Sequence, residues 1–195
     1  MVAAGLGERF GGPKGLVEVG GTPMWELGVR LLEAAGAAKV IVVGDVPGGI
    51  PGGRLRRESV AIGVAALGTE FDMVLIHDAA RPLAGEDLAR RVAGRLLRGD
   101  VDAVVPVVPL YDTIKRVDGE AVVETVDRSS LAAAQTPQGF RVEALLAAQA
   151  GDSEDASDDA VLIERIGGTV VVVPGDPTNL KVTYPGDLAV VEALR

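Results

Sequence analysis

Short apolar runs rich in β-branched residues alternate along the chain with longer segments whose apolar residues recur every three or four positions. The short runs occupy residues 40–43, 73–76, 103–108 and 169–173 and show little polar alternation, as in strands buried on both faces of a sheet. Helical spacing is found at residues 24–35, 60–67, 88–96, 161–166 and 185–194. The pattern predicts an α/β fold: a mostly parallel sheet with helices on both faces and a ligand crevice at the strand ends.

Proline and capping residues mark the predicted helix starts. Pro23 and Pro185 stand at first turns, and either Ser157 or Asp158 is placed to cap the fourth helix. The first strand is unusual, because only residues 1–4 precede the first glycine, Gly5. We expect this strand to be very short.

Residues 110–127 break the alternation of strands and helices. Asp118-Gly119 lies there between two short β-rich runs, which is a hairpin signal. The segment has too few large apolar residues for a core hairpin, so we expect it to project as a β-arm. Residues 151–155 form only a polar, acidic loop, and the chain has no repeat and no long linker. A single domain over residues 1–195 is therefore expected.

Composition narrows the possible chemistry. The 195 residues carry 19 Lys and Arg against 28 Asp and Glu, a net charge of −9, and 48% of them are apolar. With no cysteine and one histidine, disulfide frameworks, thiolate zinc sites, cysteine nucleophiles and histidine-rich metal sites are excluded. We expect a soluble, cytoplasmic protein, since no apolar run has the roughly 18–20 residues of a membrane span. The acidic balance argues against nucleic-acid binding, but local cations still permit a nucleotide ligand.

The most informative stretch is the glycine-rich segment at residues 3–14. Glycines after a buried strand let the backbone approach a ligand and direct N–H groups at phosphates. The spacing matches neither a dinucleotide fingerprint, which needs glycine in place of Phe10, nor a Walker loop, which needs Gly-Lys-Ser/Thr. Arg9 and Lys14 beside it are suited to neutralising a polyphosphate. The alternative is an ordinary turn with solvated charges.

Directly after the run at residues 73–76, the sequence His77-Asp78-Ala79-Ala80-Arg81-Pro82 places Asp78 and Arg81 at the edge of the predicted crevice. Asp78 is suited to a ribose hydroxyl or to a divalent cation carried by phosphates, since Mg²⁺ favours few protein carboxylates. The alternative is a salt-bridged loop at a strand end. His77 is assigned no chemistry.

A third candidate lies at residues 52–60, where glycines, arginines and Ser59 meet at a loop-to-helix junction. Orphan N–H groups and the positive end of the helix favour an anion or a base carbonyl there. A capped helix with exposed arginines explains the same residues. Three later pieces, at residues 112–115, 128–138 and 179–183, each combine a cation with a hydroxyl and have no evident structural purpose.

Together these pieces resemble one family along nearly the whole chain, the 2-C-methyl-D-erythritol 4-phosphate cytidylyltransferases of the non-mevalonate isoprenoid pathway. The motifs occur in the family's order: AAGxGxR…PK, GGxxRxxSV, HDAARP, DTIK, VDRxxLxxxQTPQ, SDDA and NLKVTxPxDL. The resemblance implies a Rossmann-like nucleotidyltransferase fold, dependence on Mg²⁺ and a homodimer whose β-arms interlock. It implies CMP transfer from CTP to 2-C-methyl-D-erythritol 4-phosphate, with 4-diphosphocytidyl-2-C-methyl-D-erythritol and pyrophosphate as products.

The resemblance also implies roles for particular residues. Arg9 and Lys14 match the pair that stabilises charge on the phosphates, and Arg128 and Lys181 match the pair that positions the acceptor. The remaining matches are Ala3, Ala4, Gly5, Gly53 and Ser59 in the cytidine pocket, Asp78 and Arg81 near ribose, metal and acceptor, and Thr113 and Thr136 at the acceptor.

Two departures and two rival interpretations belong with the resemblance. The first strand is abbreviated, and Arg54 stands where the family often has an acidic residue. The nearest rival is another cytidylyltransferase, acting on ribitol 5-phosphate or a sugar acid, which shares the glycine loop and HDAARP. The rival from another class is a nucleotide-binding regulator without turnover, which has no need of cations for two separate anions.

Overall fold

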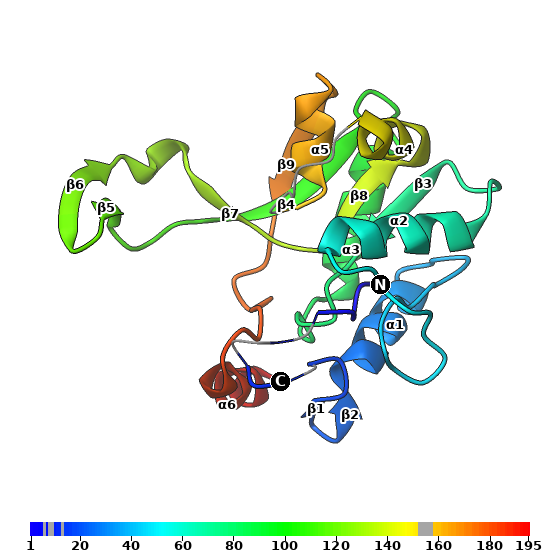
Figure 1. Ribbon diagram of the computed structural model, residues 1–195, viewed down its shortest axis with the longest axis horizontal. Helices are drawn as coiled ribbons and strands as arrows, with labels where there is room; N and C mark the ends of the chain where they lie inside the picture. The colour runs from blue at the N-terminus through cyan, green and yellow to red at the C-terminus, as the bar shows by residue number, and fades with distance from the viewer. Residues whose placement is uncertain (6, 8–9, 13, 152–157) are drawn as a thin grey trace.

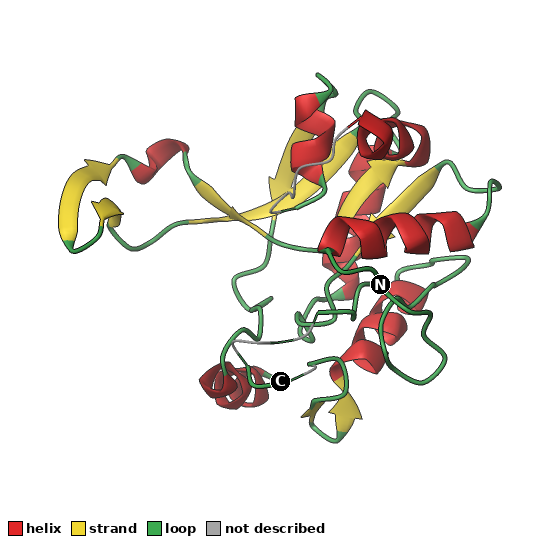
Figure 2. Ribbon diagram, viewed as in Figure 1, coloured by secondary structure: helices red, strands yellow, loops and turns green. Residues whose placement is uncertain are grey.

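The computed structural model describes residues 1–5, 7, 10–12, 14–151 and 158–195. A central sheet carries helices on both faces, and a hairpin extends far from it (Figures 1 and 2). The strands are β1 (Glu18–Val19), β2 (Thr22–Pro23), β3 (Met73–Ile76), β4 (Ala103–Pro109), β5 (Ile114–Asp118), β6 (Ala121–Val126), β7 (Ala132–Ala134), β8 (Gln138–Arg141) and β9 (Val170–Pro174). The helices are α1 (Met24–Ala34), α2 (Arg56–Leu67), α3 (Glu86–Leu96), the 3-10 turn η1 (Arg128–Ser130), α4 (Val142–Gly151), α5 (Ala160–Arg165) and α6 (Pro185–Leu194).

The central sheet has the strand order β3-β8-β4-β7, with β9 also paired to β4. Three of its four strand pairings are antiparallel and only β4–β9 is parallel, so the prediction of a mostly parallel sheet is wrong for these strands. The difference has a simple origin: β3, β4 and β9 share one direction, as the βα alternation predicts. The strands β7 and β8, which follow the hairpin, run the opposite way, and β8 lies between β3 and β4.

The first strand is as short as the sequence predicts. Val2 makes single parallel bridges to Val43 on one side and to Asp78 on the other, and Val43 bridges Ile50. Residues 40–43 were predicted as a full strand, but of these residues only Val43 takes part, through its isolated bridges to Val2 and Ile50. The same contacts place the backbone that follows Val2, Val43 and Ile76 at one edge of the molecule.

The helices agree with the apolar spacing except in one case. The structure confirms the predicted helices as α1, α2, α3, α5 and α6. Asp158 caps α5, accepting from the Val161 N–H at 3.2 Å, while the alternative cap, Ser157, lies outside the described residues. Helix α4 was not predicted, because its sequence VEALLAAQAG is apolar nearly all round and shows no single stripe.

The described core has two apolar layers, one on each face of the sheet, and two further clusters that involve α1, one with the first residues of the chain and one with α6. Along β4, Ala103 and Val105 face the layer formed with α2, α4 and α5, whereas Val104 faces the layer formed with α3. This is the two-residue alternation of a strand covered on both sides. Phe140 of β8 is fully buried in the first layer.

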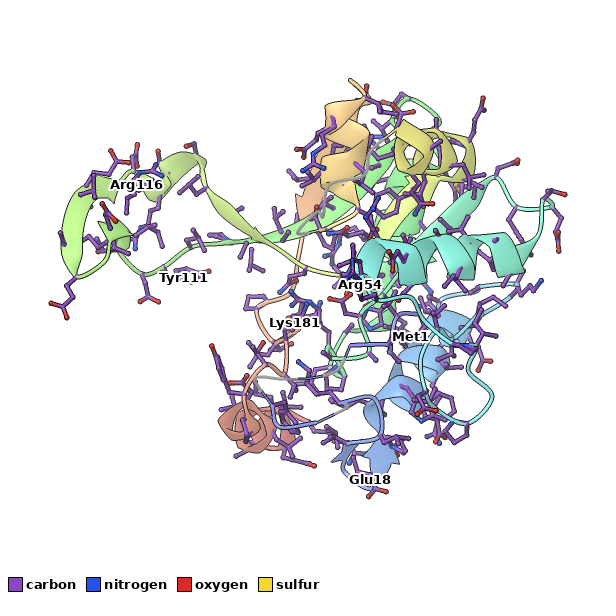
Figure 3. The ribbon with its side chains drawn as sticks, viewed as in Figure 1. Met1, Glu18, Arg54, Tyr111, Arg116 and Lys181 are labelled. Carbon is purple, nitrogen blue, oxygen red and sulfur yellow. The ribbon has the colours of Figure 1, made fainter. Side chains whose placement is uncertain are left out.

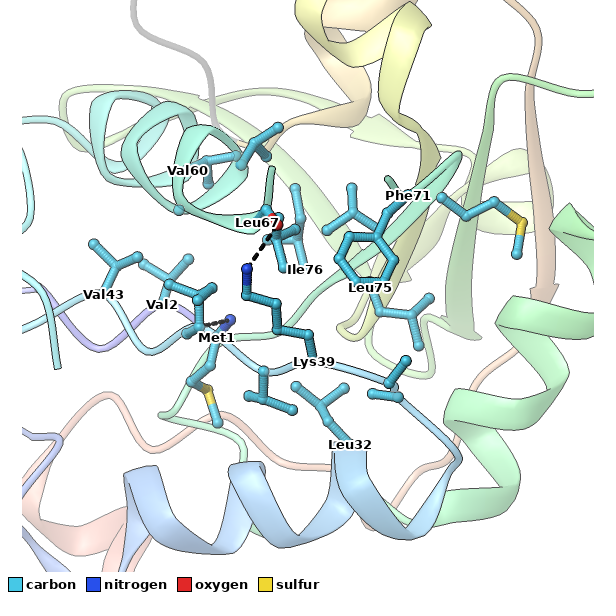
Figure 4. A pocket seen from close by; sticks show the side chains of 18 of the residues that line it. Met1, Val2, Leu32, Lys39, Val43, Val60, Leu67, Phe71, Leu75 and Ile76 are labelled. Atoms are coloured by element: carbon cyan, nitrogen blue, oxygen red, sulfur yellow. Dashed lines mark hydrogen bonds between the residues drawn. The ribbon is translucent and has the colours of Figure 1, made fainter. Parts of the chain in front are cut away.

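A separate cavity of about 210 Å³ lies between α1, α2 and β3 (Figure 4). Its wall is mostly apolar, and among the described residues on it only Lys39 has a charged side chain. That ammonium group donates to the carbonyl of Leu67 at 2.8 Å. Such a wall offers nothing to a phosphate group, so this cavity is not the site predicted from the sequence.

The segment at residues 110–127 forms the predicted hairpin, with β5 antiparallel to β6. Gly119 in its turn has φ of 56°, a conformation that favours glycine. The hairpin extends well away from the sheet (Figure 1), and Val117, Val122 and Val123 are each 60% exposed. Within the described ranges, no helix is both long and apolar enough to cross a lipid bilayer.

Phe140→Ala should lower the free energy of unfolding by about 3–5 kcal/mol, because it leaves a cavity where β8 meets α2, α4 and α5. Urea unfolding monitored by circular dichroism measures the change. The control is Leu146→Ala in α4, a side chain that is 48% exposed, which should stay within about 0.5 kcal/mol of the parent. Equal losses in the two variants would contradict the assignment of the core.

Candidate active site

A cavity of about 610 Å³ opens where the glycine-rich segment, the start of α2, the loop after β3 and the loop before α6 meet. It brings together eight of the residues singled out from the sequence: Ala3, Ala4, Gly5, Lys14, Gly53, Ser59, Asp78 and Lys181. Arg54 and Arg56 line it as well. Arg54 and Lys181, both labelled in Figure 3, come to this region from the loop that leads into α2 and from the loop before α6.

The glycine-rich segment forms a tight turn at the cavity edge. Gly7 has φ of +66°, and a Cβ built on it would lie 1.8 Å from the carbonyl oxygen of Gly12. That carbonyl turns inward because the N–H groups of Phe10, Gly11 and Gly12 all donate to the carbonyl of Gly7. The turn therefore requires glycine at position 7. Arg9, predicted beside it, lies outside the described residues.

Lys14 comes next along this segment, and its ammonium group donates to the carbonyl of Val182 at 3.0 Å. The contact ties the first loop of the cavity to the loop that carries Lys181. Two lysines that are far apart in the sequence thus stand at the same opening. This is the arrangement expected for a site that binds more than one phosphate group.

Hydrogen bonds fix the loop that leads into α2 at the edge of the cavity. The Gly53 N–H donates to Ser59 Oγ at 3.1 Å, and the Leu55 N–H donates to a Glu58 carboxylate oxygen at 3.0 Å. Ser59 is almost fully buried, so its hydroxyl holds the Gly53 loop against the helix. Hydrogen bonds to the backbone keep the pKa of Glu58 below its ordinary value. The positive end of α2 thereby faces the cavity.

Asp78 lies at the centre of an ion-pair network. Its Oδ2 accepts from Lys181 at 2.7 Å, and its Oδ1 accepts from the Arg56 guanidinium at 3.1 Å. A second arm of Arg56 pairs with Asp159, which is nearly inaccessible to solvent. These four side chains form a line of charges that alternate in sign, in the order Lys181, Asp78, Arg56 and Asp159.

This network decides the ionisation of Asp78. Burial opposes its charge, but the nearby Arg56 and then Lys181 outweigh burial, so the pKa of Asp78 lies well below its ordinary value. Burial likewise opposes the charge of Arg56, yet Asp78 and Asp159 raise its pKa above the ordinary value. For Asp159, burial raises the pKa while Arg56 acts against it. The cavity thus contains a carboxylate that stays ionised through the physiological range.

Arg81 serves the site without lining the cavity. Its guanidinium donates to the Asn179 carbonyl at 2.7 Å and to the Ala134 carbonyl at 3.1 Å. Gln135 adds a donor to the Asp176 carbonyl at 2.8 Å, and the Asn179 amide donates to the Thr136 carbonyl at 2.9 Å. These bonds fasten the loop before α6, and so they determine where Lys181 stands.

Thr136 also lies behind the cavity rather than on it. It is buried, and its hydroxyl accepts from the Asp78 N–H at 3.0 Å while lying 3.0 Å from His77 Nδ1. The structure therefore gives Thr136 a contact with the Asp78 backbone, and its contact with the acceptor stays a prediction. Burial lowers the pKa of His77 to about 4, so the imidazole is neutral at physiological pH.

Thr113 and Arg128 are not brought to their own chain's cavity. Both are exposed at the base of the hairpin, where the pairing of Ile114 with Val126 sets the two chain segments side by side. Neither residue lines the cavity that holds Lys14, Lys181 and Asp78. The predicted acceptor residues are thus divided between two regions of the chain.

Sequence reasoning missed four residues that the site depends on: Arg56, Asp159, Gln135 and Asn179. All four lie inside motifs recognised from the sequence, namely GGxxRxxSV, SDDA, QTPQ and NLKVT. The sequence did not show which residues pair with one another. Arg56 and Asp159, for example, are 103 positions apart, and an ion pair over that separation leaves no local pattern.

The fold and this site together define a nucleotidyltransferase. An α/β sheet presents at its strand ends a glycine turn, the N-terminal end of α2 and clustered cations around one ionised carboxylate. These are means of holding phosphates and of neutralising charge on them, rather than means of activating a side-chain nucleophile.

Comparison with known proteins identifies the particular family. The sequence profile of the 2-C-methyl-D-erythritol 4-phosphate cytidylyltransferases matches residues 49–195. The enzymes of that name from Streptomyces coelicolor and Nocardia farcinica are 41% and 44% identical to the chain, each over 98% of it and over 82% and 90% of their own lengths. The crystal structure of the Thermus thermophilus enzyme superposes with a TM-score of 0.83 at 37% identity, covering 95% of both chains. The chain belongs to this family.

Replacing Asp78 should alter the acid sensitivity of the fold. Its pKa is lower in the folded protein than the ordinary 3.8, so its contribution to stability is present above that value and is lost as the pH falls below it. The difference in unfolding free energy between the parent and Asp78→Asn should therefore be constant from about pH 7 to about pH 5 and should shrink progressively below about pH 4. Urea titrations across this range measure the difference. A difference that stays constant below about pH 4 as well would show that Asp78 is not ionised by its cationic neighbours.

Proposed function

We propose that this chain transfers CMP from CTP to 2-C-methyl-D-erythritol 4-phosphate, releasing pyrophosphate, as a single domain over residues 1–195. The family supports the reaction, and one observation in the structure carries it. A single cavity gathers Lys14, Lys181 and the Gly53 loop around an ionised Asp78. The nucleotide and a second anion thereby have cationic partners within the same space.

The reaction needs positioning more than it needs a reactive side chain. The phosphate oxygen of the acceptor attacks the α-phosphorus of CTP, a new P–O bond forms, and the bond to the β-phosphate oxygen breaks to release pyrophosphate. A phosphate monoester is already an anionic nucleophile, so no protein group has to be deprotonated. The neutral, buried His77 fits this chemistry because it is not available as a base. The barrier lies in bringing two polyanions together.

Roles for the residues follow from their places in the cavity. Lys14, together with Arg9, neutralises the triphosphate, and Lys181 faces the acceptor phosphate. Ala3, Ala4, Gly5, Gly53 and Ser59 form the wall for cytidine, where small residues and backbone N–H groups admit a base closely. Arg81 and Thr136 act by holding Asp78 and the Lys181 loop in place.

Asp78 is suited to hold Mg²⁺ carried by CTP. Mg²⁺ favours one or two protein carboxylates completed by phosphate oxygens and water. Among the described residues that line the cavity, Asp78 is the only carboxylate, and its Oδ2 faces Lys181 at the open side. When bound, the ion would supply further neutralisation of the triphosphate charge.

The working form of the protein is a cytoplasmic homodimer joined through the arm. The exposed valines of β5 and β6 give the arm an apolar surface that solvent alone does not favour. Arg128 and Thr113 stand at the base of this arm and away from their own cavity. They therefore contribute to acceptor binding in the cavity of the partner chain.

Pyrophosphate release from CTP tests the activity, measured with 2-C-methyl-D-erythritol 4-phosphate, ribitol 5-phosphate or a sugar acid, each with and without Mg²⁺. We expect release only with the first acceptor and with the ion. Lys14→Ala should slow turnover roughly 10²–10³-fold while leaving the thermal midpoint unchanged. Lys39→Ala, a lysine on the mostly apolar cavity, is the matched control and should retain parent activity.

Release with ribitol 5-phosphate alone would transfer the assignment to the rival cytidylyltransferase. Binding of CTP without release from any acceptor would favour the nucleotide-binding regulator. A Lys14→Ala variant with parent turnover and parent affinity would remove that residue from the mechanism.

Subunit mixing tests the shared site. Lys14→Ala has a defective cavity and Arg128→Ala a defective arm, so a mixed dimer holds one complete site. An equimolar mixture, after exchange of subunits, should recover about a quarter of parent activity, because about half of the dimers are mixed. Arg128→Ala alone should mainly raise KM for the acceptor.

Deleting residues 110–127 should yield monomers by light scattering. A deletion variant that stays dimeric would show that the arm is not the interface. In the subunit-mixing test, a mixture of Lys14→Ala and Arg128→Ala that is no more active than either variant alone would show that Arg128 acts in the cavity of its own chain.

A further inference from the structure

Asp159 has no contact with the cavity, yet it is coupled to it. The residue directly precedes α5, its side chain is 1% exposed, and its Oδ2 accepts from Nη1 of Arg56. Its other oxygen, Oδ1, is buried and has no hydrogen-bond partner in the described part of the chain. A carboxylate in such a place is costly, because burial without full pairing opposes its charge. The ion pair with Arg56 offsets part of this cost.

Arg56 connects Asp159 to the cavity. Its Nε and Nη2 face Asp78 Oδ1 at 3.3 and 3.1 Å, while Nη1 faces Asp159. The guanidinium is planar and rigid, so the orientation of one edge determines that of the other. Arg56 lines the cavity and Asp159 does not. The hydrogen-bonded connection from Asp159 to the cavity therefore passes through Arg56.

The two ends of this line of charges differ in burial, and the Arg56 side chain within it is 24% exposed. The Lys181 side chain is 43% exposed and that of Asp78 12%, and the line ends at the buried Asp159. Without the Asp159 charge, Asp78 alone would balance Arg56, and the guanidinium would be free to rotate toward it. Asp78 would then share its second oxygen with Arg56 instead of presenting it to Lys181 and to the nucleotide.

We propose that Asp159 is a positioning residue for nucleotide binding: its ion pair holds the Arg56 guanidinium on Asp78 Oδ1 and leaves Oδ2 directed into the cavity. The inference rests on the proposed function, since CTP is taken as the ligand. It adds a residue outside the cavity that determines how the cavity wall is oriented.

The test compares Asp159→Asn, Arg56→Gln and the double variant with the parent. Asp158→Asn is the matched control, because Asp158 lies beside Asp159 and caps α5 but contacts Gln138 instead of Arg56. The dissociation constant for CTP is measured by calorimetry without acceptor, and KM and kcat are measured for both substrates. Thermal midpoints report folding.

Asp159→Asn should weaken CTP binding roughly tenfold, by analogy with other supporting partners of a site, and should raise KM for CTP far more than KM for the acceptor. The double variant should bind CTP no more weakly than Arg56→Gln alone, because Asp159 acts through Arg56 and the two effects do not add. Asp158→Asn should bind CTP as the parent does.

Two results would overturn the proposal: parent-like CTP affinity in a folded Asp159→Asn, or losses in the double variant that multiply. If either single variant unfolds, the double variant decides the question, since it removes both buried charges and should fold. Parent-like CTP affinity in the folded double variant would show the pair to be structural only. A parent protein that binds no CTP would instead count against the proposed function itself.

Discussion

The active site depends on a single constraint, that a carboxylate at the floor of the cavity must stay charged and immobile while mostly buried. Asp78 meets this constraint through Arg56, 22 residues before it in the sequence, and Lys181, 103 residues after it. Attraction between charges at these distances is screened little when the pair is shielded from water. The same contacts that ionise Asp78 therefore draw α2, the loop after β3 and the loop before α6 together, and they shape the cavity.

Much of this arrangement could be predicted from the sequence, because strands that share a direction end at one edge of a sheet. Val43, Val2 and Asp78 lie side by side in parallel bridges, so the loops that follow them converge. That is why Asp78 and the Gly53 loop were predicted from their order along the chain, and why Lys14 was placed beside them. The helices and the hairpin followed equally from apolar spacing and from Asp118-Gly119.

Three features of the structure could not be predicted, because they depend on contacts between distant parts of the chain or have no local sequence pattern. The strand β8 was not predicted at all, because its sequence Gln-Gly-Phe-Arg has a single large apolar residue and no strand pattern. Among three arginines within residues 54–57, only the geometry of α2 shows that Arg56 faces both Asp78 and Asp159. The burial of Thr136 is likewise a tertiary fact, because a hydroxyl after a glutamine is equally compatible with binding a substrate or a backbone N–H.

A reaction between two polyanions also explains why charge placement takes the role that a nucleophile has in other transferases. The buried, neutral His77 and the absence of cysteine from the sequence leave cations as the principal means of catalysis. Cations gathered in one cavity repel each other unless carboxylates separate them, and the alternation of Lys181, Asp78, Arg56 and Asp159 provides that separation. In the proposed dimer the arm adds Arg128 from outside the cavity, so this positive charge comes near the site only on assembly. In a separate chain, Arg128 therefore does not repel the cations of the cavity. In the dimer, the negative charge of the bound acceptor phosphate offsets that repulsion.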